Sequence, residues 1–148
     1  MKSWPVYRMT ILNINGSILM KTFIRTRFYS FRHAFVGLIY VIHTQKNAWI
    51  HTVASFCVIL LAFWLHVTTQ DWAILILTLS AVWTAEFINT SLEAVVDLTS
   101  PQKHPLAKVG KDVGAAAVLI SALSSIVIGF LILGPPLWNR LMQIILSH

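Results

Sequence analysis

Three carboxylates and an amide recur along one stretch of the chain at the spacing of a helix face. With a neighbouring hydroxyl, the set comprises Glu86, Asn89, Thr90, Glu93 and Asp97. At about 100° per residue, the carboxylates and the amide fall within an arc of roughly 80° and cover about 16 Å of helix. The surrounding stretch is apolar, and ionisable groups in such a helix normally face protein or water and mark function. The spacing therefore predicts a functional helix face whose carboxylates can hold magnesium.

A second polar cluster follows shortly afterwards in the sequence. It comprises, in order, His104, Lys108, Lys111 and Asp112. The histidine and the lysines share a helix face if Pro101 or Pro105 lies in the first turn. Lysines beside carboxylates can hold phosphates while the carboxylates hold magnesium, and phosphoryl transfer requires this combination. The alternative is that the lysines follow the positive-inside rule and that Asp112 suits a helix start.

The composition places these residues in a membrane protein. The chain of 148 residues is 57% hydrophobic and 11% charged, whereas a soluble domain carries about 25% charged residues. Of the eleven basic residues, seven lie at or before Lys46, ahead of the first acidic residue, Asp71. A basic segment followed by apolar sequence suits an anionic membrane surface better than nucleic acid. We therefore expect no nucleic-acid partner.

Three stretches are apolar enough to cross a bilayer, which requires about 20 helical residues. They run from about Trp49 to Val67, from about Trp72 to Leu98 and from about Val113 to Leu133. Gly134-Pro135-Pro136 predicts a helix stop after the third stretch. His51 and His66 flank the first stretch, and we interpret them as interface residues rather than metal ligands.

Hydrophobic residues also recur at helical spacing before the first span. They are Phe28, Phe31, Phe35, Leu38, Ile39 and Ile42. The pattern predicts an amphipathic helix on the cytoplasmic membrane surface, although a helix packed on the bundle would show the same pattern. The expected fold class is therefore all-α: an integral membrane protein with three transmembrane helices and an N-terminal amphipathic surface helix.

The charges of the loops predict the orientation. The segment before the first span is basic, residues 68–71 contain no Lys or Arg, and residues 98–112 contain three lysines. By the positive-inside rule, the N-terminus and the 98–112 loop are cytoplasmic. Glu86 then lies about 21 Å in from the outer boundary, where the polar face can meet a lipid headgroup and a water-soluble ligand. The alternative is that the span ends at Glu86 and the remainder is a solvated helix.

Two sequence motifs carry the polar residues. The first is Glu86-Phe-Ile-Asn-Thr-Ser-Leu-Glu-Ala-Val-Val-Asp97, and the second is His104-Pro-Leu-Ala-Lys-Val-Gly-Lys-Asp112. Both closely resemble the prokaryotic diacylglycerol kinase family, which includes the undecaprenol kinases of Gram-positive bacteria. The resemblance covers about residues 28–133, and divides the chain into a basic extension (1–27), a membrane lipid-kinase domain (28–133) and a C-terminal tail (134–148).

This resemblance implies a kinase that transfers the γ-phosphate of ATP to diacylglycerol or undecaprenol, giving phosphatidic acid or undecaprenyl phosphate. It implies that Glu86 is the general base, that Glu93 binds magnesium, and that the lipid contacts Glu86, Phe35 and Gly37. The residues that the resemblance implies for ATP binding are Asn89, Glu93, Asp97, Gln102, Lys103, His104, Lys111 and Asp112. It also implies a homotrimer with sites shared between subunits, in the cytoplasmic membrane of a bacterium or cyanobacterium.

One position departs from the family pattern. Gln45 stands where the family has its second metal-binding carboxylate, just before the first span. An amide offers oxygen to a hard cation but brings no charge, so we expect weaker magnesium binding. Two other interpretations remain open: a catalytically weakened family member with a structural role, and a proton or cation conductor lined by Glu86 and Glu93.

Overall fold

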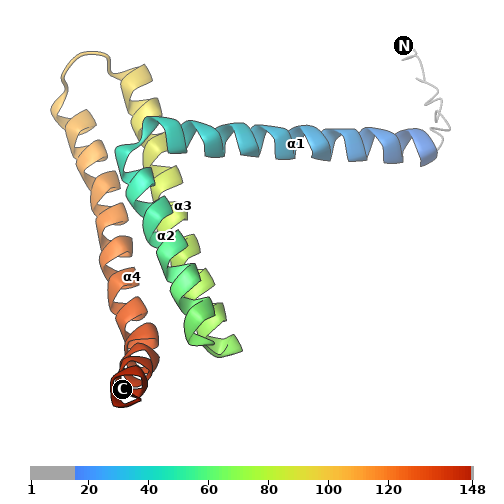
Figure 1. The fold of residues 1–148 in the computed structure, drawn as a ribbon. Helices are drawn as coiled ribbons and strands as arrows, with labels where there is room; N and C mark the ends of the chain where they lie inside the picture. Colours follow the sequence, from blue (N-terminus) through green and yellow to red (C-terminus); the bar gives the residue numbers. More distant parts are fainter. Residues whose placement is uncertain (1–15, 148) are drawn as a thin grey trace, which may run out of the picture. The chain divides into compact units, whose positions relative to one another are not determined.

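The protein is built from helices alone in the part of the chain that the structure, a computed structural model, describes, residues 16–147. The helices are α1 (Gly16–Thr44), α2 (Lys46–Leu65), α3 (Thr69–Thr99) and α4 (Pro105–Leu146) (Figure 1). Three of them, α2, α3 and α4, are long and apolar enough to cross a membrane. The predicted all-α class is therefore confirmed, and the chain is a multi-pass membrane protein.

The chain forms two compact units, and the division falls within α1 after Ile39. The described part of the first unit, residues 16–39, is helical, so the helix predicted from the hydrophobic spacing is confirmed and begins upstream of Phe28. Phe28, Phe31 and Phe35 are all exposed on it. Its location on a membrane surface stays a prediction.

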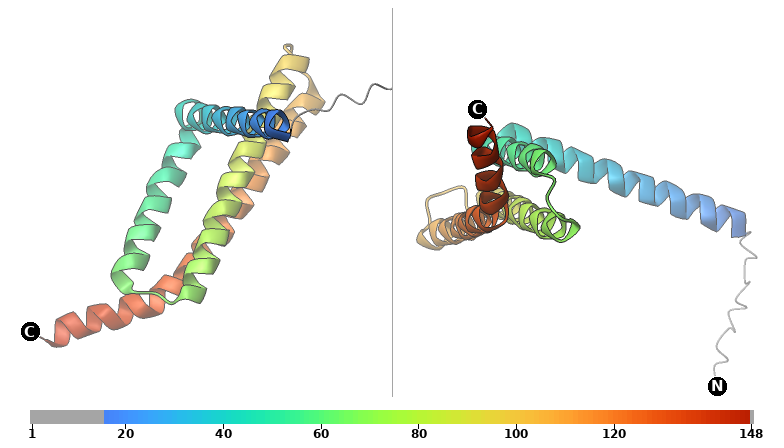
Figure 2. Two further views of the ribbon diagram at one scale, coloured as in Figure 1. Left: turned by 90° about the vertical axis from the view of Figure 1, so that its right-hand side faces the viewer. Right: turned by 60° about the horizontal axis from the view of Figure 1, so that its bottom comes forward.

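A tight turn joins α2 to α3. His66 ends α2 in the left-handed conformation, with φ of 51°. Thr68 then begins α3 with a capping box: its hydroxyl accepts the backbone N–H of Asp71, and its own N–H is accepted by the Asp71 carboxylate. Such reciprocal bonds satisfy N–H groups that a helix start otherwise leaves free. These two helices therefore form an antiparallel hairpin (Figure 2).

The apolar core lies near the α2–α3 turn. It contains Ala62, Leu75 and Leu133, which come from α2, α3 and α4 respectively, with further apolar side chains packed around them. Most large hydrophobic side chains elsewhere are exposed, among them Leu77 and Phe130. In a membrane protein such side chains contact lipid or other subunits, because hydrocarbon imposes no penalty on them.

The predicted helix stop at Gly134-Pro135-Pro136 is wrong. α4 continues through both prolines to Leu146, and its last part turns away from the direction of the first part (Figure 2). Proline removes a helix hydrogen bond and bends the helix, but its fixed φ of about −65° is itself helical. The prolines therefore redirect the helix without ending it, and most of the C-terminal tail that begins at residue 134 is a continuation of α4.

Candidate active site

The polar face of α3 becomes steadily more accessible from Glu86 toward the end of the helix. Glu86 is 1% exposed and Asn89 is 7% exposed, whereas Glu93 is half-buried and Asp97 is exposed. Thr90 is buried too, and its hydroxyl donates to the Glu86 carbonyl at 2.9 Å. A solvated helix beyond the span would not bury these groups. The face predicted from spacing is therefore packed inside the protein at its deep end.

Asn89 connects the polar face to α4. Its Nδ2 donates to Glu93 Oε1 at 3.0 Å, while its buried Oδ1 has no hydrogen-bond partner. That oxygen faces Gly114 so closely that a Cβ at this position would collide with it. α4 therefore approaches α3 at a glycine, and the approach fixes where the amide of Asn89 points.

His51 lies opposite Glu86 across the α2–α3 contact. Its Nε2 is 3.9 Å from Glu86 Oε2, and both atoms are buried without a hydrogen-bond partner. The side chain of His51 is only 13% exposed and packs between α2 and α3, so it does not stand free on the surface as a membrane-interface side chain would, and its depth in the membrane stays a prediction. A signal for this was present: in an antiparallel hairpin turning at residues 66–68, position 51 falls beside about position 83, one helical turn from Glu86.

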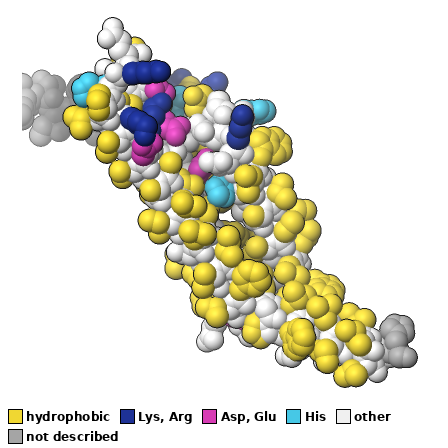
Figure 3. All heavy atoms as spheres, turned by 90° about the vertical axis from the view of Figure 1, so that its left-hand side faces the viewer, with side chains coloured by type: hydrophobic (Ala, Val, Ile, Leu, Met, Phe, Trp, Pro, Cys, Tyr) yellow, Lys and Arg dark blue, Asp and Glu magenta, His cyan; other side chains and the backbone are white. Residues whose placement is uncertain are grey.

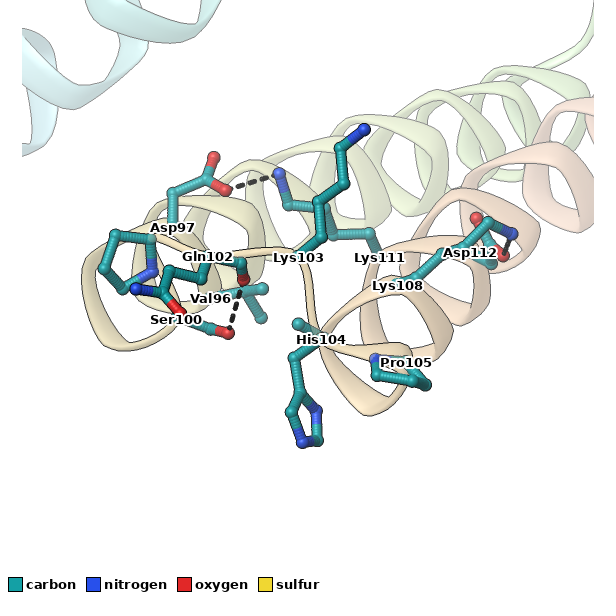
Figure 4. Close-up of a pocket in the computed structure, with 12 residues that line it drawn as sticks. Val96, Asp97, Ser100, Gln102, Lys103, His104, Pro105, Lys108, Lys111 and Asp112 are labelled. Carbon is teal, nitrogen blue, oxygen red and sulfur yellow. Dashed lines mark hydrogen bonds and ion pairs between the residues drawn. The ribbon is translucent and has the colours of Figure 1, made fainter.

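Beyond the deep carboxylate, the loop between α3 and α4 borders a pocket of about 740 Å³ (Figure 4). Six of the residues predicted to bind ATP line it: Asp97, Gln102, Lys103, His104, Lys111 and Asp112. The structure thus brings together these six, while the other two, Asn89 and Glu93, lie further along α3 toward Glu86. On the face drawn in Figure 3, acidic side chains and Lys or Arg side chains gather toward one end, and hydrophobic ones cover the remainder.

The lysines of this pocket pair with different carboxylates. Lys111 Nζ lies 2.6 Å from Asp97 Oδ1, which joins α4 to α3 (Figure 4). Lys108 Nζ lies 2.6 Å from Asp112 Oδ2 within α4. Exposed pairs of this kind contribute only about 0–1 kcal/mol to stability. Breaking these ion pairs therefore costs little free energy, and the lysines can bind a phosphate instead of their carboxylates.

His104 caps the start of α4. Pro105 is the first residue of the helix, as one of the two placements considered from the sequence predicts. His104 is the N-cap, and its Nδ1 accepts the backbone N–H of Leu106 at 3.2 Å. The expected shared helix face of His104, Lys108 and Lys111 is therefore not formed, because the histidine precedes the helix and its imidazole points away from Lys111 (Figure 4).

Three further predicted site residues belong to the start of α2 and to α1. Gln45 is the half-buried N-cap of α2, its side chain makes no capping bond, and among residues 16–147 no hydrogen bond joins it to Glu93. Phe35 and Gly37 belong to the first unit, on α1. Phe35 is exposed, and a Cβ at Gly37 would meet nothing within 4 Å.

Oxygen donors suited to magnesium are present on α3. The carboxylate of Glu93 and the unpartnered Oδ1 of Asn89 are hard ligands of the kind that magnesium prefers. Within the described residues no three His, Cys, Asp or Glu side chains gather to hold a metal ion. These donors fit part of a magnesium site, and ATP phosphates or a second subunit would have to supply the other ligands.

A match to a known protein family identifies the family of this chain. Residues 32–133 match the family described as prokaryotic diacylglycerol kinase, which is more than half of the chain. The chain belongs to this family. The resemblance predicted from the two motifs is thereby confirmed, and the matched part of this family member ends just before Gly134-Pro135-Pro136.

Individual relatives in the prokaryotic diacylglycerol kinase family carry two different names. A diacylglycerol kinase of Synechocystis sp. is 45% identical over 109 residues, covering 73% of this chain and 62% of the relative. The undecaprenol kinase of Bacillus subtilis is 36% identical over 110 residues, covering 74% of this chain and 89% of the relative. A diacylglycerol kinase of Helicobacter pylori is 37% identical over 101 residues, covering 63% and 78%. The match thus spans less than two thirds of the Synechocystis protein.

Proposed function

We propose that this protein is an integral-membrane lipid kinase that transfers the γ-phosphate of ATP to a lipid alcohol. The lipid is diacylglycerol or undecaprenol, and the product is phosphatidic acid or undecaprenyl phosphate. Both names occur among its relatives. We place the protein in the cytoplasmic membrane of a bacterium or cyanobacterium, with its N-terminus and the 98–112 loop in the cytoplasm, as the distribution of lysines favours.

The observation that carries the proposal is the buried Glu86 at one end of a polar helix face whose other end meets a lysine-lined pocket. Glu86 is 1% exposed within a helix long enough to span the membrane. Asp97, at the shallow end, is bonded to Lys111 of the pocket. In the proposed arrangement the lipid hydroxyl approaches the first group from the bilayer side, and the nucleotide approaches the second from water.

In the proposed reaction, Glu86 acts as the general base. Its carboxylate takes the proton of the lipid hydroxyl as that oxygen attacks the γ-phosphorus, and the bond from phosphorus to the β-phosphate oxygen breaks to release ADP. Lys111 and Lys103 neutralise phosphate charge, and Gln102, His104 and Asp112 line the nucleotide side. Phe35 and Gly37 of α1 would contact the lipid.

Magnesium would neutralise charge on the ATP phosphates when bound. Glu93 would hold it, with Asn89 keeping that carboxylate in place through their 3.0 Å hydrogen bond. Asp97 would order the neighbouring phosphates together with Lys111. Gln45 would add an uncharged oxygen at most, so we expect the metal to bind more weakly than it would beside a carboxylate.

We further propose a homotrimer whose active sites are shared between neighbouring subunits. Exposed apolar side chains along α2, α3 and α4 support such an assembly, because they leave wide surfaces for other subunits or lipid. The incomplete magnesium site within the described residues supports it as well. Chemical crosslinking of the purified protein in micelles tests the subunit number.

The decisive experiment offers labelled ATP with diacylglycerol or undecaprenol to the purified protein in mixed micelles. We expect one lipid to be phosphorylated, and Glu86→Gln to lower kcat by roughly 100-fold or more, because the base is removed. Ser91→Ala, an exposed change on the same helix, is the matched control. A folded oligomer that phosphorylates neither lipid would refute the proposal and favour the weakened-enzyme interpretation, whereas ion flux without ATP would favour the conductor.

A further inference from the structure

We propose that His51 is a positioning residue that holds Glu86 Oε2, so that the other carboxylate oxygen is directed at the lipid hydroxyl. This inference rests on the proposed kinase function. It concerns a residue of α2, whereas the base itself belongs to α3. The two side chains are brought together only by the hairpin.

The geometry shows two polar atoms facing each other without partners. His51 Nε2 and Glu86 Oε2 are 3.9 Å apart, and neither has a hydrogen-bond partner. Buried polar atoms are nearly always hydrogen-bonded, because leaving one unpaired costs roughly 1–3 kcal/mol. A movement of about 1 Å brings the pair to hydrogen-bonding distance. Catalytic hydrogen bonds are often this long before substrate binds and shorten in the complex.

The surroundings hold the imidazole in place and leave Glu86 as its polar neighbour. The ring of Trp83 stands edge-on to that of His51, with centroids 6.3 Å apart and planes at 68°. Trp83 Nε1 in turn donates to Ser55 Oγ at 3.2 Å, which ties α3 to α2 one turn further along. These contacts place Trp83 beside the imidazole on one side, while His51 Nε2 faces the Glu86 carboxylate on the other.

The chemical consequence follows from the two oxygens of a carboxylate. A free carboxylate can rotate and present either oxygen in several directions. Once Oε2 accepts the Nε2–H of His51, rotation is restricted and the second oxygen keeps one direction, toward the substrate. Misplacement of a reacting group by about 1 Å can lower a rate roughly 100-fold. His51 therefore acts on kcat through Glu86, and it needs no contact with ATP.

The test compares three variants of the full chain in mixed micelles. His51→Phe keeps a ring against Trp83 but removes the donor, and we expect kcat to fall about 10- to 100-fold with KM for ATP unchanged. His51→Gln restores an N–H donor, and we expect it to recover part of kcat. The control is His66→Asn, an exposed position at the far end of α2 where asparagine tolerates the left-handed conformation.

A second measurement does not depend on turnover. In protein labelled with 15N-histidine, we expect Glu86→Gln to shift the ring signals of His51 and to leave those of His66 unchanged. An unchanged His51 signal overturns the pairing, whether or not the enzyme is active. If wild-type protein is active and Glu86→Gln is not, but His51→Phe keeps full kcat, the positioning role is wrong while the kinase function stands. If wild-type protein phosphorylates neither lipid, the function fails first.

Discussion

The bundle of α2, α3 and α4 differs markedly between its two ends. Near the α2–α3 turn, Ala62, Leu75 and Leu133 form a core of apolar contacts. Toward the α3–α4 loop the buried groups are polar, and Glu86 and Asn89 each leave an oxygen without a partner. Apolar packing stabilises without specifying chemistry, whereas unpartnered buried oxygens cost stability unless something else binds them. One end therefore holds the helices together, and the other keeps buried polar atoms with no partner among the described residues.

The comparison predicts that changes at the apolar end lower stability without lowering the rate. In Leu75→Ala a side chain that is 2% exposed is truncated. We expect the free energy of unfolding in micelles to fall by about 2–4 kcal/mol, because a cavity is left. We also expect kcat per folded molecule to be unchanged. Leu77→Ala, at a side chain 72% exposed, is the control for stability and should leave the free energy of unfolding of the subunit unchanged. A large loss of kcat in Leu75→Ala would contradict the separation.

At the polar end the opposite result is expected from Gly114→Ala. The added methyl would collide with Asn89 Oδ1 and would lie 3.1 Å from a Leu92 methyl. Because Asn89 must then move and release Glu93, we expect kcat to fall about 10- to 100-fold. Gly129→Ala on the same helix meets nothing within 4 Å. That control should keep its rate and gain up to about 1 kcal/mol of stability from helix propensity. Equal rates in the two variants would refute this role of Gly114.

The pocket should respond in nucleotide affinity rather than in stability. We expect Lys111→Met to raise KM for ATP about tenfold, because one charged hydrogen bond to phosphate is lost. Thermal stability should change little, since the Asp97 carboxylate in this pair is 66% exposed. Arg140→Met, near the C-terminal end of α4, removes the same charge away from the pocket. If both variants bind ATP equally well, Lys111 does not contact the nucleotide.

The smallest effect is expected at the residue that departs from the family pattern. Gln45→Glu would supply the missing carboxylate, and we expect it to lower the magnesium concentration for half-maximal rate several-fold, because a charge is added near the cation. Asn47→Asp adds the same charge at a neighbouring exposed position and serves as the control. An identical response in both variants would show that the charge acts at a distance and that position 45 is no ligand.

Local patterns in the sequence were sufficient to predict the helices and much of the site. Apolar stretches give the spans because a membrane helix must be long and apolar whatever its neighbours are. The helical spacing of Glu86, Asn89, Glu93 and Asp97 places them on one face for the same local reason. The residues lining the pocket follow closely after that face in the chain, so that the loop between α3 and α4 brings them together.

What could not be predicted depends on contacts between distant segments. His51 precedes Glu86 by one whole hairpin, and its side chain is buried only because α2 packs on α3. The collision that makes Gly114 necessary likewise appears only once α4 lies against Asn89. The continuation of α4 through Pro135 and Pro136 was mispredicted. Proline was read as a helix stop because it removes a backbone hydrogen bond, although its ring also fixes φ at a helical value.

The two prolines also restrict how deeply α4 can sit in the bilayer. Neither Pro135 nor Pro136 has a backbone N–H, so the carbonyls of Leu131 and Ile132 lack their usual donors four residues on. In hydrocarbon each unsatisfied carbonyl costs several kcal/mol, whereas water near the headgroups can bond it. Moving this bend of α4 from the headgroup region into the hydrocarbon is therefore unfavourable, because these carbonyls would lose their bonds to water. Since α4 contacts Asn89 at Gly114, the same bend bears on the depth at which the neighbouring Glu86 lies in the bilayer.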